Sequence, residues 1–301
     1  MKILNFGSLN IDYTYDVDHF VRGGETLSSA SLHTYGGGKG LNQSIAAGRS
    51  GAQVWHAGAV GGEGGFLLKL LEDAGVHTGY VARTEEKTGH AVIQRDRSGQ
   101  NCILLYGGAN QTVTPAQAET VLSRFSAGDW LMLQNEISSV GAIMEAAHRI
   151  GMRIALNPSP MDEKITAYPL QTVDLLILNE VEAAELCGQE QAEGPALLRV
   201  LGEKFPECAV VLTLGASGAW YRCAGEVLFQ ESFSVPVTDT TGAGDTFTGF
   251  LLGALVRGES PARAMREAAA AASIAVTRPG AAASIPTAGE VREFLKERFP
   301  G

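Results

Sequence analysis

A short stretch, TDTTGAGDTF at 238–247, places two glycines among hydroxyl and carboxylate side chains directly before an apolar run. The apolar residues that follow recur with helical spacing, which predicts a helix over 244–257. The start of a helix offers unpaired backbone N–H groups and a partial positive charge. A phosphate could reach these groups with little side-chain obstruction, because three small residues lead into the helix: Gly242, Ala243 and Gly244.

Asp245 permits two interpretations. Aspartate is a favoured helix N-cap, so its position at the helix start has a purely structural explanation. However, Asp239 lies earlier in the same stretch among threonines, and an N-cap needs one carboxylate rather than a polar cluster. We therefore favour an ionised Asp245 that is kept charged by the helix dipole and can accept a proton from an alcohol.

A second glycine run, YGGGKGLNQ at 35–43, leads into a predicted helix over 40–50. It is neither a Walker A loop, which needs Ser or Thr after the lysine, nor the G-x-G-x-x-G dinucleotide fingerprint. A tight strand-to-helix turn would explain the glycines, but it leaves the polar side chains of Lys39 and Asn42 unexplained. These two residues are therefore candidate hydrogen-bond donors to a polar ligand.

Polar side chains also follow several predicted strands. Asn10 and Asp12 come after the first strand, where an Asx-turn would look the same. Glu136 in LQNE follows another strand, and Asn179 and Glu182 in NEVE follow a third. Open α/β sheets bind their ligands at the carboxyl ends of the strands. Carboxylates and amides gathered at that edge favour polyols, phosphates and Mg²⁺ over an apolar ligand.

Strand-length apolar runs alternate with helical patterns along the chain. Strands are predicted over 2–7, 53–60, 129–133, 152–156, 173–178 and 208–214. Helices are predicted over 40–50, 64–75, 138–150, 180–187, 193–204, 244–257, 261–276 and 287–299, with capping signals at Thr114, Ser260 and Thr287. This alternation is typical of a parallel sheet with helices on both faces, and the three closing helices indicate one continuous domain.

Two regions, 12–34 and 88–106, break the alternation. The second predicts a hairpin with a polar turn over 96–100. We expect an antiparallel flap that projects from the parallel sheet. The pattern leaves open whether this flap is a lid or a solvent-facing edge hairpin.

Composition narrows the class of protein. The net charge of −10 opposes binding to nucleic-acid phosphates, and no apolar run reaches the roughly 20 residues of a membrane helix. The four cysteines include no C-x-x-C pair, and the histidines show no metal-ligand spacing, whereas oxygen-ligated Mg²⁺ remains open. The first residues, MKILNFGSLNID, do not look like a secretory signal, so we expect a cytoplasmic protein.

Four stretches in their order and spacing resemble the ribokinase-like (PfkB) carbohydrate kinase family over nearly the whole chain. They are SLNID at 8–12, GGGKGLNQSIAAGRSGA at 36–52, NEVE with TLGASG at 179–182 and 213–218, and DTTGAGDTFTGF at 239–250. The resemblance implies a three-layer α/β/α sandwich with a mostly parallel central sheet and a small antiparallel β lid. It implies a single domain over 1–301, a lid formed by about 12–34 and 88–106, and a homodimer contact through that lid.

The resemblance also implies an ATP-dependent sugar kinase. Asp245 would take the proton from the sugar's primary hydroxyl as that oxygen attacks the γ-phosphoryl group of ATP, and the N–H groups of 242–244 would stabilise the charge. Besides Asp245, the implied sugar-binding residues are Asn10, Asp12, Gly38, Lys39, Asn42 and Glu136. The residues implied to serve ATP and Mg²⁺ are Asn179, Glu182, Thr213, Gly215, Gly218 and Gly244.

Within the family, the residues resemble the ribokinase branch, whose substrate is D-ribose and whose product is D-ribose 5-phosphate, phosphorylated on O5. Members of this branch carry K⁺ beside the anion site, and the matching positions here are Asp239, Thr241, Ala275, Arg278, Gly280 and Ser284. The alternatives are a kinase for deoxyribose, fructose, ketodeoxygluconate or a nucleoside, and a catalytically silent sugar or nucleotide sensor. The intact GAGD motif argues against the sensor, and the missing dinucleotide fingerprint argues against a nicotinamide oxidoreductase.

Overall fold

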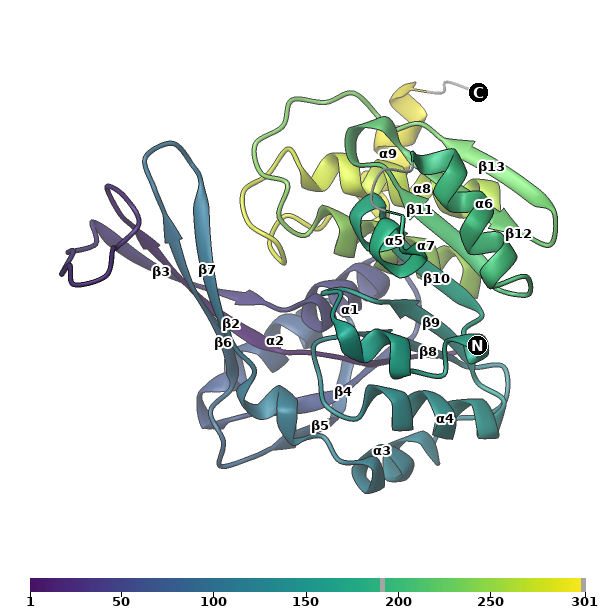
Figure 1. Cartoon of the computed structure of the whole chain (residues 1–301), viewed down its shortest axis with the longest axis horizontal. Coiled ribbons are helices and arrows are strands. Elements are labelled where there is room, and N and C mark those ends of the chain that lie inside the picture. Colours follow the sequence, from purple (N-terminus) through teal and green to yellow (C-terminus); the bar gives the residue numbers. More distant parts are fainter. Residues whose placement is uncertain (190–192, 299–301) are drawn as a thin grey trace.

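A nine-stranded sheet forms the centre of the molecule in the computed structural model, which describes residues 1–189 and 193–298 (Figure 1). Its strands run in the order β13 (Glu226–Gln230), β12 (Ala219–Cys223), β11 (Ala209–Thr213), β10 (Leu175–Asn179), β9 (Arg153–Asn157), β8 (Trp130–Gln134), β1 (Ile3–Phe6), β4 (Val54–Val60) and β5 (His77–Arg83). All pairs from β11 to β5 are parallel, and β12 and β13 add an antiparallel hairpin. The carboxyl ends of the parallel strands therefore share one edge.

Helices cover both faces of this sheet. One face carries α1 (Lys39–Arg49), α2 (Gly65–Asp73), α7 (Ala243–Val256), α8 (Pro261–Ala275) and α9 (Ala288–Arg298). The other carries α3 (Pro115–Leu122), α4 (Val140–Ile150), α5 (Glu180–Cys187) and α6 (Gly194–Lys204). Strand β8 supplies both cores, because Trp130 and Met132 point to the first face and Leu131 and Leu133 to the second. The predicted three-layer sandwich is confirmed.

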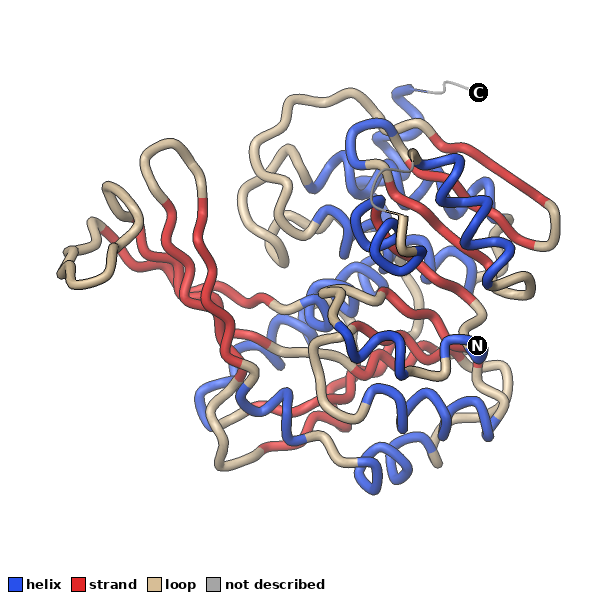
Figure 2. Tube along the Cα trace, in the orientation of Figure 1, coloured by secondary structure: helices blue, strands red, loops and turns tan. Residues whose placement is uncertain are grey.

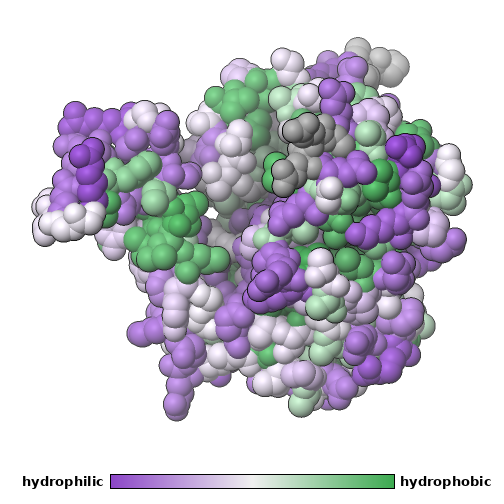
Figure 3. Space-filling model, in the orientation of Figure 1, coloured by the Kyte–Doolittle hydropathy of each residue, from purple (hydrophilic) through white to green (hydrophobic). Residues whose placement is uncertain are grey.

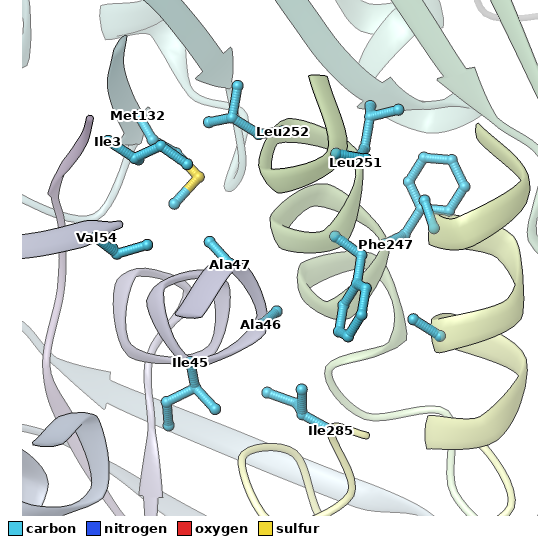
Figure 4. Close-up of a cluster of buried hydrophobic side chains, with 14 of the residues drawn as sticks. Ile3, Ile45, Ala46, Ala47, Val54, Met132, Phe247, Leu251, Leu252 and Ile285 are labelled. Atoms are coloured by element: carbon cyan, nitrogen blue, oxygen red, sulfur yellow. The ribbon is translucent and has the colours of Figure 1, made fainter. Parts of the chain in front are cut away.

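Helices α1 and α7 pack closely in the first core (Figure 4). A Cβ atom at Gly249 of α7 would lie 2.4 Å from Cβ of Ala46 and 2.6 Å from the carbonyl oxygen of Gln43, both in α1. Glycine is therefore required for this approach. The close contact brings the first turn of α1 beside the first turn of α7.

A second, four-stranded sheet projects from the body (Figure 2). Its order is β3 (Ser31–Gly37), β2 (Asn10–Asp16), β6 (Gly89–Arg95) and β7 (Asn101–Tyr106), and we call it the lid. The outer pairs are antiparallel and include the predicted β6–β7 hairpin, but the central β2–β6 pair is parallel. The reason is topological: between the two strands the chain passes through β3, α1, β4, α2 and β5, and it returns in the same direction.

Five strands were not predicted from the pattern: β2 and β3 of the lid, and β5, β12 and β13 of the main sheet. β5 is an edge strand whose polar residues hide its alternation, and β12 and β13 are short strands that follow the last predicted strand. The SLNID stretch is also not a turn alone, since Asn10 and Asp12 already belong to β2. Residue 299, the expected end of the last helix, lies outside the described residues. None of the helices described has both the length and the apolar character needed to cross a membrane.

Candidate active site

Asp245 lies in the first turn of α7 and is almost completely buried. The N-cap of this helix is Gly242, so the N-cap interpretation of Asp245 is wrong. Its Oδ2 accepts a hydrogen bond from Nδ2 of Asn42 at 3.0 Å, and its Oδ1 accepts one from Nε2 of Gln43 at 2.9 Å. Because an ionised carboxylate has about four acceptor sites, capacity remains for a further donor such as an alcohol.

The loop before Asp245 exposes backbone donors. Gly242 has a φ of 74°, in the region that favours glycine, and Gly244 has open space where a Cβ atom would lie. The N–H of Ala243 donates to the carbonyl oxygen of Thr240 at 3.2 Å, whereas within the described part of the chain the N–H groups of Gly242 and Gly244 have no acceptor. The start of α7 can therefore bind an anion next to the Asp245 carboxylate.

Glu136 lies beyond the end of β8 and links the first strands to α1. Its Oε2 accepts hydrogen bonds from the Ser8 hydroxyl and, at 2.9 Å, from the Lys39 backbone N–H. Burial raises the pKa of Glu136, although the Ser8 hydroxyl and the charge of Lys39 act in the opposite direction. For Lys39, burial disfavours the charge, but nearby carboxylates, first Asp245 and then Glu136, raise the pKa overall. Opposite charges thus meet beside Asp245.

Asp12 and Asn10 reach the same region from the lid. A Cβ atom at Gly37 would lie 2.0 Å from Oδ2 of Asp12, so β3 can pass this carboxylate only with glycine there. Burial and the neighbouring charge of Glu136 raise the pKa of Asp12 to about 7. The Oδ1 of Asn10 accepts a hydrogen bond from Nδ2 of the buried Asn110 at 2.7 Å.

Two acceptor atoms in this region are buried and have no hydrogen-bond partner within residues 1–189 and 193–298: Oδ1 of Asn42 and Oε1 of Gln134. A buried acceptor without a donor is unfavourable by about 1–3 kcal/mol. The same Asn42 side chain donates from Nδ2 to Asp245, so a ligand hydroxyl beside Asp245 could donate to Oδ1 of Asn42. Gly38 lies directly before α1, with the Ser8 hydroxyl 3.0 Å from where its Cβ atom would be.

Asn179 and Glu182, expected near phosphate and Mg²⁺, form a capping box at the start of α5. The Asn179 N–H donates to Oε2 of Glu182, and the Glu182 N–H donates to Oδ1 of Asn179, both at 2.9 Å. This pairing gives both residues a structural role. The charge of Glu182 nevertheless acts on Lys39, so this carboxylate lies near the same carboxyl edge of the sheet as the carboxylates above.

The three residues expected at the nucleotide lie where β11 ends. Thr213 is the last residue of β11, and Gly215 and Gly218 flank the short turn before β12 with φ values of 54° and 119°. A Cβ atom at Gly218 would lie 2.2 Å from the Gln230 carbonyl oxygen. This turn therefore requires glycine for backbone reasons alone.

The expected cation positions belong to two joined loops. Oδ1 of Asp239 accepts hydrogen bonds from the Thr241 N–H and hydroxyl, and its Oδ2 accepts one from the Gly280 N–H at 2.8 Å. Although partial burial opposes this, these bonds hold the pKa of Asp239 below its ordinary value. The Ala275 carbonyl accepts from the Arg278 N–H, and the buried Ser284 hydroxyl donates to the Ala281 carbonyl. The side chain of Arg278 instead pairs with Glu290.

Three residues of this region were not predicted from the sequence: Ser8, Gln43 and Asn110. Ser8 and Gln43 lie inside the quoted motifs, so only their neighbours drew attention. Asn110 belongs to a short 3-10 turn over Gly108–Thr112, and no pattern marked it. Among the residues described, no three His, Cys, Asp or Glu side chains come together as a metal site.

The comparison with known proteins assigns the family. The model of the pfkB family carbohydrate kinases matches residues 1–288. The chain belongs to this family. This chain is 35% identical over 298 residues to a ribokinase from Haemophilus influenzae, and the match covers 96% of this chain and 97% of that protein.

Solved structures of ribokinases share the fold of this chain. A ribokinase from Cryptococcus neoformans in complex with ADP matches with a TM-score of 0.85 and 34% identity, covering 97% of this chain and 99% of that one. A ribokinase from Arabidopsis thaliana complexed with ribose and ATP matches with a TM-score of 0.86 and 30% identity, covering 98% of both chains.

Proposed function

We propose that this pfkB carbohydrate kinase transfers the γ-phosphoryl group of ATP to O5 of D-ribose. The observation that carries the proposal is the Asp245 carboxylate, which lies beside the unpaired N–H groups of Gly242 and Gly244. Asp245 removes the proton from the O5 hydroxyl while that oxygen forms a bond to the γ-phosphorus. The bond from the γ-phosphorus to ADP breaks. The N–H groups of Gly242 and Gly244, which lie on either side of Ala243 in the chain, stabilise the negative charge.

The sugar lies between the lid and the start of α1. Asp12 and Asn10 approach it from the lid, Lys39 and Glu136 supply charges, and Oδ1 of Asn42 gains the donor that it lacks. The backbone at Gly38 passes close to it. The preference for ribose over another sugar or a nucleoside rests on the near-full-length similarity to ribokinases. A silent sensor is less well supported, because it would not need the buried Asp245 carboxylate beside the loop donors.

ATP lies along the carboxyl ends of β10 and β11, next to Thr213, Gly215 and Gly218. Glu182 and Asn179 would hold Mg²⁺, which would neutralise phosphate charge and, because it commonly keeps several waters, would need few protein ligands. K⁺ would lie at the joined loops, held by Asp239 and by oxygens at Thr241, Ala275, Arg278, Gly280 and Ser284. The carboxylate and carbonyl oxygens there suit a hard cation.

We also propose that two copies of the chain associate through the lid, and that the enzyme works in the cytoplasm. The edge strand β7 is exposed along its whole length, and Figure 3 shows an apolar patch on the lid. All four cysteines are free, which suits a reducing compartment.

The function is tested by ribose-dependent ADP formation with wild-type protein and the Asp245→Asn variant. An amide cannot take the hydroxyl proton, so kcat should fall by about 10²- to 10⁴-fold while the thermal midpoint stays close to wild type. Ribose-independent ADP formation by wild type, or near-normal turnover of the variant, would contradict the proposal.

A further inference from the structure

A buried side-chain amide, that of Gln43, contacts the Asp245 carboxylate. Gln43 is completely buried, and its Nε2 donates to Oδ1 of Asp245 at 2.9 Å and to Oδ1 of Asn157 at 3.1 Å. Both hydrogens of the amide are therefore used. The Asn157 side chain is itself fixed, because its Nδ2 donates to the Ile177 carbonyl at 2.9 Å.

The other end of the Gln43 amide is also fixed. Its Oε1 accepts a hydrogen bond from Nε2 of the buried Gln134 at 2.7 Å, and the same nitrogen donates to Oδ1 of Asn5 at 3.1 Å. If the Gln43 amide were flipped, its oxygen would face the acceptor oxygens of Asp245 and Asn157, and its nitrogen would face the donor on Gln134. The network thus permits one orientation of Gln43.

The chain of hydrogen bonds continues to a buried histidine. Asn5 donates from Nδ2 to the Ser44 hydroxyl at 2.7 Å, and Ser44 lies 2.8 Å from Nδ1 of His56. His56 Nε2 lies 3.2 Å from the Gly7 carbonyl, which can only accept, so this nitrogen carries the proton. Burial lowers the pKa of His56 to about 4, so the ring is neutral and its Nδ1 accepts from Ser44. The direction of each bond from Gly7 to Asp245 is therefore set.

Such a network is unfavourable unless it is satisfied, and Oε1 of Gln134 has no hydrogen-bond partner among the described residues. Apolar side chains of the same size would fill this space without that penalty. We propose that Gln43 is a positioning residue that holds the Asp245 carboxylate in the orientation needed to take the sugar proton, and that Gln134 locks Gln43. The inference rests on the proposed function, since it names what orients the proposed base.

A double-mutant cycle tests this inference. Gln43→Met keeps the size of the side chain and removes its donor, so kcat should fall between about 10-fold and about 100-fold while KM for ribose and ATP changes little. Gln134→Met should lower kcat less than Gln43→Met does, because Gln43 keeps its hydrogen bond to Asp245 and loses only the hydrogen bond from Gln134 that fixes its amide. In the Asp245→Asn background, Gln43→Met should change the residual turnover by less than about 2-fold, since the group it orients is absent.

Gln53→Met, the same substitution at an exposed position, is the matched control and should leave kcat unchanged. Thermal midpoints of all variants show whether the fold is kept. The inference is overturned if Gln43→Met leaves kcat within about 2-fold of wild type, or if its loss is equally large in the Asp245→Asn background. If wild type does not phosphorylate ribose, the proposed substrate is wrong, and the same cycle with the sugar that wild type prefers still decides the role of Gln43.

Discussion

Asp12 is the side chain of the site whose charge should change near neutral pH. Its pKa is raised to about 7 by burial and by the charge of Glu136, so it is mostly protonated below that pH and mostly ionised above it. An ionised carboxylate accepts stronger hydrogen bonds from sugar hydroxyls than a neutral acid does. Sugar affinity should therefore improve as the pH rises through the pKa of Asp12.

We predict that KM for ribose increases by up to about 10-fold when the pH falls from about 8 to about 6 at saturating ATP, following the protonation of Asp12. Steady-state kinetics at a series of pH values measures this. Asp12→Asn should have a higher KM that no longer depends on pH in this range. A variant that keeps the wild-type pH profile would assign the effect to another group.

Single residues were predictable from the sequence where a motif marked them, as with Asp245 and Asn42. Their contacts were not, because the partners lie far apart in the chain: Gln43 and Asp245 are separated by 202 positions, and Asn10 and Asn110 by 100. The N-cap interpretation of Asp245 failed for a related reason. The left-handed Gly242 starts the helix earlier, which leaves Asp245 free to bond α1.

At the scale of elements, the lid strand β7 is unusual because consecutive apolar residues are exposed. Ile103, Leu104 and Leu105 are 56%, 71% and 50% exposed, although alternate residues of a strand point to opposite faces. β7 is also an edge strand of the lid, with one side unpaired. Such an edge tends to pair with another chain. The proposed dimer contact would cover it.

Leu104→Lys should weaken the dimer, because a charge would be buried in an apolar contact. Sedimentation velocity over a range of protein concentrations measures the change in mass, and the variant should dissociate at a higher concentration than wild type. Val227→Lys is the control, since Val227 is 51% exposed on β13, at the edge of the main sheet. A monomeric wild-type protein, or equal effects of both substitutions, would contradict a contact through the lid.

Elements with strong periodicity were predictable, including the helices that follow the two glycine loops. The parallel pairing of β2 with β6 was not, because it depends on the path of the chain between the two strands and not on either strand's own pattern. The β12–β13 hairpin was missed because its strands, AWYRC and EVLFQ, mix polar with apolar residues at a partly exposed edge of the sheet, unlike the apolar runs of the buried strands.

At the scale of the whole molecule, the parallel sheet collects residues from distant parts of the chain at one edge. Helix starts, strand ends and lid strands all contribute side chains to this region, and the sandwich architecture explains why they meet. The order of strands and helices was sufficient to predict this arrangement. It does not by itself select one sugar, since related kinases use the same fold for different acceptors.

The most direct test of ribose phosphorylation is therefore a panel of acceptors at saturating ATP, Mg²⁺ and K⁺: ribose, deoxyribose, fructose, ketodeoxygluconate and adenosine. Production of ADP gives kcat/KM for each, and phosphorus NMR of the best product locates the new phosphate. We predict the highest kcat/KM for D-ribose and a phosphate on O5. A higher kcat/KM for any other acceptor, or a phosphate at another position of ribose, would contradict this prediction.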